Sequence, residues 1–283
     1  CHSAFSFLDG ASLPDELAGA AAELGYEAMA LTDHNSVSGS MEFAQAARDL
    51  GGLRPIHGAE VTFVDGASSD PRHLTLLVRD ARGWANLCRL LTRAHAHTRV
   101  YGSERLEPRR EGPRRSRGSA TRTSRVVDDP RVTLEDVEAH AEGLVCLSGC
   151  ARQGIRDEPT MRRLLRAFGR DAFRVELQRP FHRHDRALNR GLAALADRLG
   201  VPCVATGNVH AHTPARARLQ DAFVAIREHS TLDASEPLRR GNHSHVLATP
   251  EAMAARFADH PEAVAETERL ADTLRFDLTS DLG

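Results

Sequence analysis

Residues 28–34 read Ala-Met-Ala-Leu-Thr-Asp-His, an apolar run that stops abruptly at a carboxylate and an imidazole. Such a run predicts a buried strand that carries polar side chains at its end. In α/β barrels the functional residues lie at the carboxyl ends of the strands. Asp33 and His34 therefore mark a candidate site, and other strand ends with the same chemistry would support that interpretation.

The composition limits the classes of protein to which this chain can belong. It has 283 residues, 41% hydrophobic and 27% charged, which suits one large or two small globular domains. The formal net charge of −2 shows no overall bias toward nucleic acid or membranes, and no apolar stretch approaches the roughly 18 residues that span a bilayer. All 37 basic residues are arginine, which excludes the lysine chemistry of P-loops, Schiff bases and kinases.

The cysteines are widely scattered and odd in number: Cys1, Cys88, Cys146, Cys150 and Cys203. This pattern predicts reduced thiols and a cytoplasmic protein. The chain starts with cysteine rather than methionine, and we expect its natural sequence to extend upstream.

The hydrophobic periodicity alternates between strands and helices. Residues 1–10 are expected to pass from a strand end into a loop, and further strands are predicted at 26–31, 55–64, 73–78, 143–148, 173–177 and 201–206, about seven in all. Helices are predicted at 12–24, 40–50, 81–97, 133–141, 161–168, 185–199, 215–228, 250–258 and 261–274. Ser12 with Glu16 is predicted to form a capping-box-like arrangement, and Thr133 with Asp136, three residues on, has the spacing of a capping box. This order predicts a parallel α/β sheet or barrel, whereas a Rossmann sheet is disfavoured because no glycine-rich fingerprint follows a strand.

Residues 99–131 interrupt this alternation. The segment is rich in arginine, glycine, serine and proline and poor in apolar residues, which predicts a flexible surface insertion. Its basic cluster, Arg114, Arg115 and Arg117, could contact nucleic-acid phosphates, but a solvated loop is the favoured interpretation.

Polar side chains with metal-binding chemistry recur at the predicted strand ends. They are His2, Asp9, Asp33, His34, Glu60, His73, Cys150, Asn208 and His210. One such histidine is more often a hydrogen-bonded structural group than a ligand. Nearly every strand end, however, offers an imidazole, carboxylate or thiol, the usual ligands of divalent transition metals. Because the set is too large for one tetrahedral ion, it predicts a multinuclear cluster.

An ordered set of motifs carries a resemblance to a known family. The motifs are Cys-His-Ser-Ala-Phe-Ser-Phe-Leu-Asp-Gly-Ala-Ser (1–12), Leu-Thr-Asp-His (31–34), Gly-Ala-Glu (58–60), His-Leu-Thr-Leu-Leu-Val (73–78), Leu-Ser-Gly-Cys (147–150) and Thr-Gly-Asn-Val-His (206–210). Together they resemble the PHP (polymerase and histidinol phosphatase) domain. More narrowly, they resemble the N-terminal domain of bacterial C-family DNA polymerases of the III alpha-subunit type, in the error-prone, damage-inducible branch.

The resemblance implies a distorted, TIM-like (β/α)7 barrel over residues 1–248, followed by a helical connector over 249–283 toward a C-terminal polymerase body. It also implies up to three divalent ions (Zn, Mn or Fe). One would use His2, Glu60 and Asn208; a second Asp9, His34 and His210; and a third Glu60 as a bridge with His73 and Cys150. Asp33 would then orient a ligand.

Two departures from the family pattern affect the first of these three positions. The first histidine of the His-x-His pair would fall immediately before Cys1, and Asn208 stands where the family usually has aspartate. An amide is a weaker ligand than a carboxylate, so we expect this position to be weak or empty.

The implied function is that of a domain of an error-prone DNA polymerase, a nucleotidyltransferase acting in translesion synthesis and DNA repair. The domain itself would be a metal-dependent phosphoesterase with proofreading or pyrophosphate-hydrolysing activity, in which His210 or Asp33 handles protons. A non-catalytic metal-binding module that braces the polymerase is one alternative, and a free-standing phosphatase of histidinol-phosphate type is another. The implied partners are DNA, the C-terminal polymerase domains, and the sliding clamp or other mutagenesis proteins, with no membrane.

Overall fold

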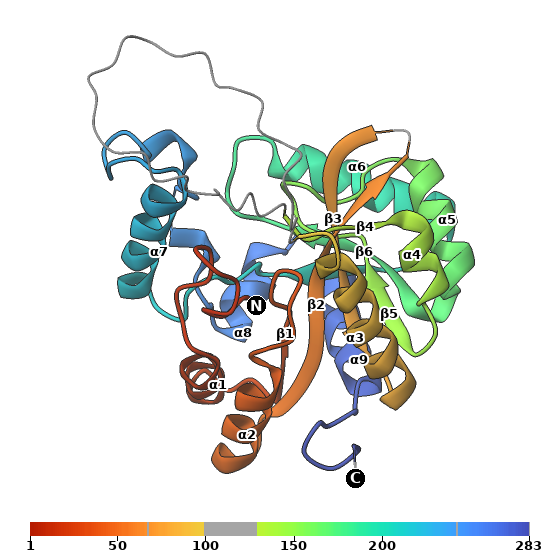
Figure 1. The fold of residues 1–283 in the computed structure, drawn as a ribbon, viewed down its shortest axis with the longest axis horizontal. Helices are drawn as coiled ribbons and strands as arrows, with labels where there is room; N and C mark the ends of the chain where they lie inside the picture. The colour runs from red at the N-terminus through yellow and green to blue at the C-terminus, as the bar shows by residue number, and fades with distance from the viewer. Residues whose placement is uncertain (67, 99–128, 242, 283) are drawn as a thin grey trace, which may run out of the picture.

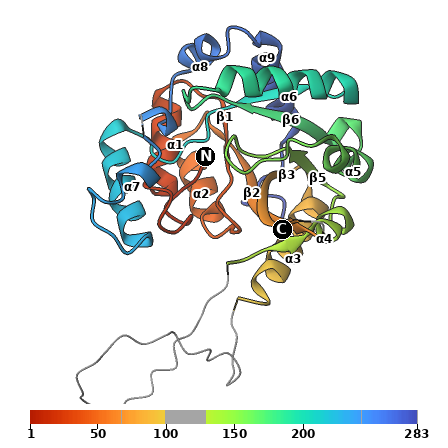
Figure 2. The same ribbon diagram turned by 90° about the horizontal axis from the view of Figure 1, so that it is seen from above.

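The computed structural model describes residues 1–66, 68–98, 129–241 and 243–282. Over these residues, strands pair in the order β1-β2-β3-β5-β6-β7, with β4 against β2. The strands are Ala28–Leu31 (β1), Arg54–Asp65 (β2), Ser68–Val78 (β3), Val132–Thr133 (β4), Leu144–Leu147 (β5), Phe173–Gln178 (β6) and Cys203–Thr206 (β7). The sheet curls on itself, and most helices lie around its outer face (Figures 1 and 2). The prediction of an α/β fold with a distorted, barrel-like sheet is confirmed.

The helices follow the predicted periodicity closely. They are Pro14–Glu23 (α1), Ser40–Leu50 (α2), Ala81–His95 (α3), Leu134–Ala139 (α4), Glu158–Phe168 (α5), Asp185–Leu199 (α6), Pro214–Arg227 (α7), Pro250–Arg256 (α8) and Pro261–Thr273 (α9), with short 3-10 turns at Arg170–Ala172, Glu236–Leu238 and His243–His245. None of the helices in the described ranges is long and apolar enough to cross a bilayer. The arginine-rich insertion predicted at 99–131 lies outside the described residues, except for its last three.

The prediction of a purely parallel sheet is wrong at β3. This strand runs antiparallel to both of its neighbours, β2 and β5. Only two residues separate Asp65 at the end of β2 from Ser68 at the start of β3, and a parallel crossover needs about a dozen or more residues. The reversal places the first half of β3 at the end of the sheet where β2 finishes, so that His73 pairs with Thr62 near the end of β2.

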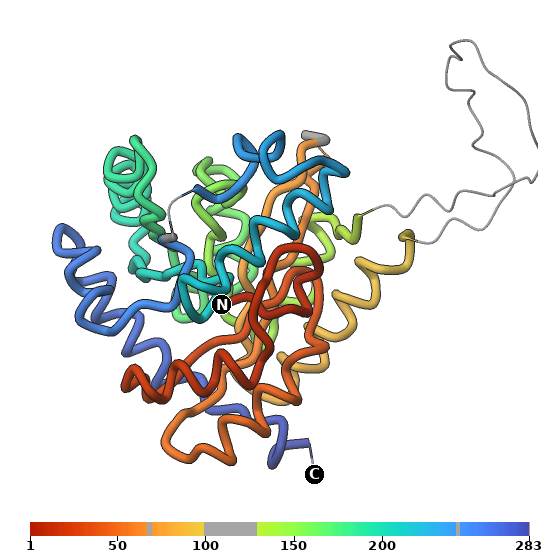
Figure 3. Tube along the Cα trace, turned by 90° about the vertical axis from the view of Figure 1, so that its left-hand side faces the viewer, coloured from red at the N-terminus to blue at the C-terminus, as the bar shows by residue number. Residues whose placement is uncertain are grey.

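The sheet remains open between β1 and β7, its two outer strands. Residues 1 and 2 bridge the opening at one end: Thr32 N–H donates to the Cys1 carbonyl at 2.8 Å, and His2 N–H donates to the Val209 carbonyl at 2.8 Å. The first residue therefore lies in the middle of the molecule, as Figure 3 shows. Below this bridge is a cavity of about 270 Å³ with a mainly apolar lining that includes Met29 and Val204.

The two predicted capping boxes have different outcomes. Thr133 caps α4, and Asp136 completes the box, as predicted. Ser12 does not cap α1; Leu13 is its N-cap residue, and the Glu16 carboxylate accepts the Leu13 N–H at 2.9 Å. The Ser12 hydroxyl instead contacts His212 Nδ1 at 2.8 Å and accepts its backbone N–H at 2.9 Å. It thereby links the N-terminal loop to the segment that follows β7.

The C-terminal helices pack on the sheet. Thr267 of α9 bonds through its hydroxyl to both Ala205 N–H and Ala205 C=O in β7, each at 3.0 Å. Phe257 and Phe276 are buried in the largest hydrophobic cluster together with the strands. The division of the chain at residue 248 stays a prediction.

Candidate metal centre

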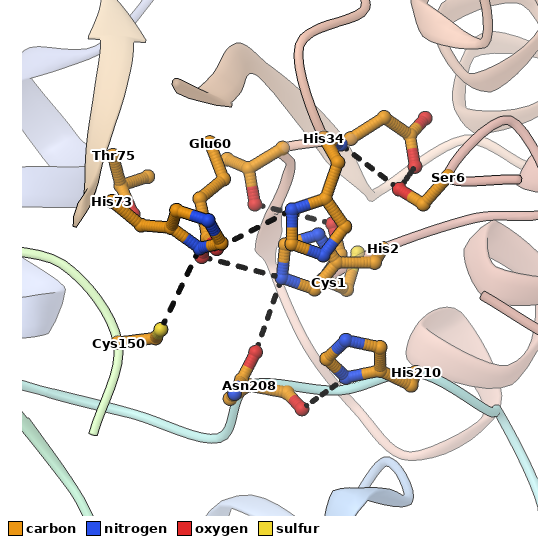
Figure 4. A network of polar contacts seen from close by, with 12 residues as sticks. Cys1, His2, Ser6, His34, Glu60, His73, Thr75, Cys150, Asn208 and His210 are labelled. Atoms are coloured by element: carbon orange, nitrogen blue, oxygen red, sulfur yellow. Dashed lines mark hydrogen bonds and ion pairs between the residues drawn. The ribbon is translucent and has the colours of Figure 1, made fainter. Parts of the chain in front are cut away.

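The predicted ligands lie together at one end of the curled sheet; Figure 4 shows them except Asp9, which contacts His34 and His210. They come from separate segments: the loop before α1 (His2, Asp9), the segment after β1 (His34), β2 (Glu60), β3 (His73), the turn after β5 (Cys150) and the loop after β7 (Asn208, His210). The ligand atoms of five of them form two overlapping groups, His2-His34-His210 and His34-Glu60-His73, each within 4.8 Å.

Glu60 lies at the centre of the cluster and is 3% exposed. Its Oε1 is 2.5 Å from His73 Nδ1 and 3.3 Å from His34 Nδ1, and its Oε2 is 3.8 Å from His2 Nε2. Burial disfavours the charged carboxylate, but the charge of His34 and the hydrogen bond from His73 outweigh it and lower the pKa of Glu60 to about 2. Glu60 is therefore an anion faced by three imidazoles.

Asp9 is the second anion of the cluster. Its Oδ2 is 2.9 Å from His34 Nε2 and 3.0 Å from His210 Nε2. Burial opposes its ionisation, but the charge and hydrogen bond of His210, followed by His34 and Arg240, hold the pKa of Asp9 well below its usual range. His34 thus lies between two carboxylates. Although burial acts in the opposite direction, the hydrogen bond to Asp9 and the charge of Glu60 raise the pKa of His34.

The hydrogen bonds of His210 define where a cation is needed. Its Nδ1 lies 2.8 Å from the Asn208 carbonyl, which can only accept, so Nδ1 carries the proton. Burial, followed by the charge of Arg240, lowers the pKa of His210 to about 4, so the ring is neutral near pH 7. Its Nε2 lone pair then faces the Asp9 carboxylate at 3.0 Å. Two acceptors facing each other require a cation, which the guanidinium of Arg240 provides here and which a divalent metal ion would also provide.

His2 supplies further unused ligand capacity. Its ring stacks on His34 with centroids 4.5 Å apart and lies 4.4 Å from His210. Its Nε2 is 3.1 Å from Asn208 Oδ1, while its buried Nδ1 has no hydrogen-bond partner among the described residues. Burial, together with the neighbouring His210 and His34, holds the pKa of His2 well below its usual value. Neutral imidazoles packed in this way are suited to metal ligation.

Cys150 lies at the edge of the cluster, with its Sγ 4.0 Å from His73 Nδ1. Burial, followed by the charge of Glu60, raises the pKa of this thiol to about 12. Cys150 is therefore a thiol in the metal-free protein. It falls outside both of the close groups of ligand atoms, and its assignment as a ligand stays a prediction.

Asp33 lies beside the cluster and contacts different partners. Its Oδ1 accepts Ser3 N–H at 2.6 Å and the Ser6 hydroxyl at 2.7 Å, and its Oδ2 accepts the Ser3 hydroxyl at 2.7 Å. The Ser6 oxygen in turn accepts His34 N–H at 3.0 Å. These contacts fix the N-terminal loop and the backbone of His34, which is a positioning role; the proposed proton transfer by Asp33 stays a prediction.

Sequence reasoning did not include Arg240, which enters the cluster from the loop between α7 and α8. Its Nη2 is 2.8 Å from Asp9 Oδ1, 2.6 Å from Asp9 Oδ2 and 2.6 Å from His210 Nε2. His245, also unpredicted, contacts the Asn208 carbonyl through Nδ1 at 3.0 Å. Neither residue follows a strand, so a search of strand ends could not find them.

A cleft of about 990 Å³ opens onto the cluster and is lined by Asp9, His34, Glu60, His73, Cys150, Asn208 and His210. Cationic and aromatic side chains also line it, among them Phe7, Arg131, Arg152, Arg227 and Arg240. Phe7 is 84% exposed. A cleft of this size and charge can accommodate a nucleotide-sized anion.

The fold and the cluster define a class: an α/β barrel with a candidate multinuclear metal centre at the mouth of its sheet. The profile of the PHP domain matches residues 1–180, and the chain belongs to this family. The predicted family resemblance is confirmed.

Relatives of known name are similar over nearly the whole chain. The error-prone DNA polymerase of Symbiobacterium thermophilum is 38% identical over 287 residues, covering 97% of this chain and 24% of that protein. The error-prone DNA polymerase of Anaeromyxobacter dehalogenans is 38% identical over 278 residues, covering 98% of this chain and 22% of that protein. This chain thus spans about a quarter of the length of these relatives. Among solved structures, an amidohydrolase from Chromobacterium violaceum aligns with a TM-score of 0.49 at 19% identity, over 74% of this chain and 85% of that one.

Proposed function

We propose that the mouth of this barrel hydrolyses phosphoesters with the help of divalent metal ions. The observation that carries the proposal is the convergence of ligand atoms in two overlapping groups, His2-His34-His210 and His34-Glu60-His73, each within 4.8 Å, at a cleft with cationic side chains. Metal ions would bind this cluster, and the cleft would receive the anionic substrate.

The ions would be held in the three positions that the family resemblance implies. One ion would be held by Asp9, His34 and His210, a second by Glu60, His73 and Cys150, and a third by His2, Glu60 and Asn208. When bound, such ions supply the Lewis acidity that activates water and neutralises phosphate oxygens. Zn, Mn and Fe all suit a mixed imidazole, carboxylate and thiol set.

The residues of this chain would contribute binding and orientation. Asp33 holds the loop that carries Asp9 and, through Ser6, the backbone of His34. His210 keeps Nδ1 protonated by its bond to the Asn208 carbonyl and presents Nε2 to the cleft, where Nε2 would bind an ion or, with no ion on it, handle a proton. Arg152 and Arg227 line the cleft and offer hydrogen-bond donors to phosphate oxygens.

The relatives support an inference about the substrate and the biological setting. We infer that the parent protein is an error-prone DNA polymerase acting in translesion synthesis and repair, in the cytoplasm. Its partners would be DNA, its own C-terminal polymerase domains, and the sliding clamp or other mutagenesis proteins. The phosphoester would then be the 3′ end of a DNA strand, in proofreading, or the pyrophosphate that polymerisation releases.

The test is an assay with Mn²⁺, Zn²⁺ or Fe²⁺ on two substrates, a 3′-labelled single-stranded oligonucleotide and inorganic pyrophosphate. We expect metal-dependent turnover of one of them, lost on Glu60→Gln. Cys88→Ala, a change in α3 away from the cluster, is the matched control and should keep full activity. Metal binding without turnover of either substrate would overturn the catalytic proposal.

One observation favours a second candidate, a metal-binding module that braces the polymerase without catalysis. Asn208 offers His2 a neutral amide oxygen at a position where the family usually has a carboxylate. Thermal unfolding with and without chelator separates the two functions. Metal that raises the melting temperature of a protein with no turnover would support the structural role, whereas turnover would exclude a purely structural one.

A further inference from the structure

Arg240 makes its closest contacts to the atoms that would bind one of the metal ions. Its Nη2 is 2.6 Å from Asp9 Oδ2 and 2.6 Å from His210 Nε2. Asp9 Oδ2 also faces His34 Nε2, which is 2.9 Å away. The guanidinium thus supplies the positive charge that this pair of acceptors requires.

A metal ion and Arg240 cannot occupy this position together. An ion bound by a carboxylate oxygen and an imidazole nitrogen lies about 2.0–2.2 Å from each. Nη2 at 2.6 Å from the same two atoms would overlap with that ion, and like charges repel at this separation. Binding of the ion therefore requires the guanidinium to move away from Asp9.

The surroundings of Arg240 allow such a movement. The residue lies in the loop between the 3-10 turns Glu236–Leu238 and His243–His245, and its side chain is 17% exposed at the edge of the cleft. Its buried Nε has no hydrogen-bond partner among the described residues. Arg227 contributes a second positive charge 3.7 Å from Asp9 Oδ1, and this charge disfavours keeping Arg240 in place.

The part of the cluster around Glu60 differs from the Asp9 position in its ion-pair partners. Glu60 has only imidazoles as ion-pair partners among the described residues, namely His2, His34 and His73. At the position next to Asp9, a metal ion would compete with the guanidinium of Arg240, which is part of the chain. At the position next to Glu60, it would compete with exchangeable protons on the imidazoles.

We propose that Arg240 is a resident cation that competes with a divalent ion for the position formed by Asp9, His34 and His210. The position next to Glu60 and His73 then fills first, and the Asp9 position fills only when Arg240 leaves it. The released guanidinium remains at the edge of the cleft, where a phosphate oxygen would be its natural partner. The proposal requires metal binding but not turnover, so it fails or succeeds independently of the proposed hydrolysis.

The experiment is a titration of the metal-free protein with Zn²⁺ or Mn²⁺, followed by calorimetry and by competition with a chromophoric chelator. Arg240→Gln removes the charge but keeps a polar side chain of similar reach. We expect it to tighten the weaker class of sites roughly 10- to 100-fold, the range set by loss of a charge-assisted hydrogen bond, and to leave the tighter class unchanged.

Two further variants serve as controls for this test. Arg239→Gln removes the same charge from the neighbouring residue, which contacts the Leu232 carbonyl instead of the cluster, and should bind metal as the parent does. Arg240→Lys keeps the charge on a shorter side chain and should give a smaller gain, which supplies a result even if the glutamine variant unfolds. Unchanged or weaker metal binding in the folded Arg240 variants would overturn the proposal. So would a metal-loaded crystal structure with an ion at Asp9 and Arg240 still bonded to it.

Discussion

Strand β2 carries a buried histidine and a buried glutamate three residues apart, in opposite surroundings. Because side chains alternate along a strand, residues 57 and 60 point to opposite faces. Glu60 faces the imidazoles of the cluster at distances of 2.5–3.8 Å. His57 lies edge-on to Trp84 and Phe276, with centroids 6.2 and 6.3 Å away, and neither of its ring nitrogens has a hydrogen-bond partner among the described residues.

His57 and His34 show that burial alone does not set the pKa of a histidine in this protein. His57 is 1% exposed, and burial lowers its pKa to about 4. For His34, burial also acts downward, yet the bond to Asp9 and the charge of Glu60 raise the pKa. His34, a candidate metal ligand, differs from the packing histidine His57 because the carboxylates of Asp9 and Glu60 flank it.

The largest effect is expected from Glu60→Gln. Loss of a second-shell partner already costs roughly 10–100-fold in metal affinity, and Glu60 is itself a predicted ligand shared between ions. We therefore expect a loss beyond that range, measured by competition with a chromophoric chelator.

Glu176→Gln is the matched control for Glu60. Glu176 is also fully buried, on β6, but its carboxylate bonds to neutral groups, Thr206 at 2.5 Å and Gln178 at 2.9 Å. Glu176→Gln should lower the metal affinity less than tenfold. Equal losses in the two variants would show that any buried carboxylate of the barrel supports the metals, and the contrast drawn on β2 would be lost.

The next prediction concerns His57, on the face of β2 that packs against Trp84 and Phe276, and it is a dependence of stability on pH. The pKa of His57 is lowered from 6.5 to about 4 in the folded protein. Its neutral form therefore stabilises the fold fully above the unfolded pKa, and this contribution is lost as the pH falls from 6.5 to 4. The cost is roughly 3 kcal/mol of unfolding free energy at pH 4.

His57→Phe isolates this contribution because other histidines of the metal-free protein titrate in the same range. Phenylalanine keeps a ring between Trp84 and Phe276 but binds no proton. Denaturant unfolding at pH 7 and pH 4.5 should show a smaller loss of stability in the variant than in the parent. Parallel losses in the two proteins would mean that His57 is not the buried neutral group described above.

A moderate effect is expected from Asp33→Asn, which weakens the contacts to Ser3 and Ser6. Hydrogen bonds to a charged group contribute roughly 1–3 kcal/mol, so stability should fall by about that amount, with only a small loss of metal affinity. Ser6→Ala should reproduce part of this loss of stability, because the substitution removes the link between Asp33 and His34 N–H. A large fall in turnover in a variant of normal stability would instead make Asp33 a catalytic residue.

The sequence predicted the positions of the helices and strands well, and the relative directions of the strands less well. Helices α2 and α6 have the predicted bounds, 40–50 and 185–199, because periodicity over several turns is a strong local signal. The reversal of β3 depends on a two-residue connection after Asp65 and on pairing across the sheet, which periodicity does not encode. Strand β4 has only two residues, too few for any pattern.

The site was predictable where its residues follow strands. The motifs brought Glu60, His73, His34 and His210 into one set, and the structure places them together. Arg240 was not predictable, because its contact to Asp9 joins residues 231 positions apart, and it lies in a loop with no motif. The surroundings of His57 likewise depend on Phe276, which is 219 positions away along the chain.

The smallest effect is expected from Asn208→Asp, which restores a carboxylate 3.1 Å from His2. In the metal-free protein a further anion near Glu60 and Asp9 is repelled, so the melting temperature should fall. With metal the new charge becomes a ligand, and affinity should rise roughly tenfold, at the low end of what one interaction at a metal site contributes. Gln45→Glu adds the same charge at an exposed position on α2 and should change neither quantity. If Asn208→Asp lowers stability without any gain in metal affinity, the position near His2 does not bind metal, and His2 belongs with His57 as a packing histidine.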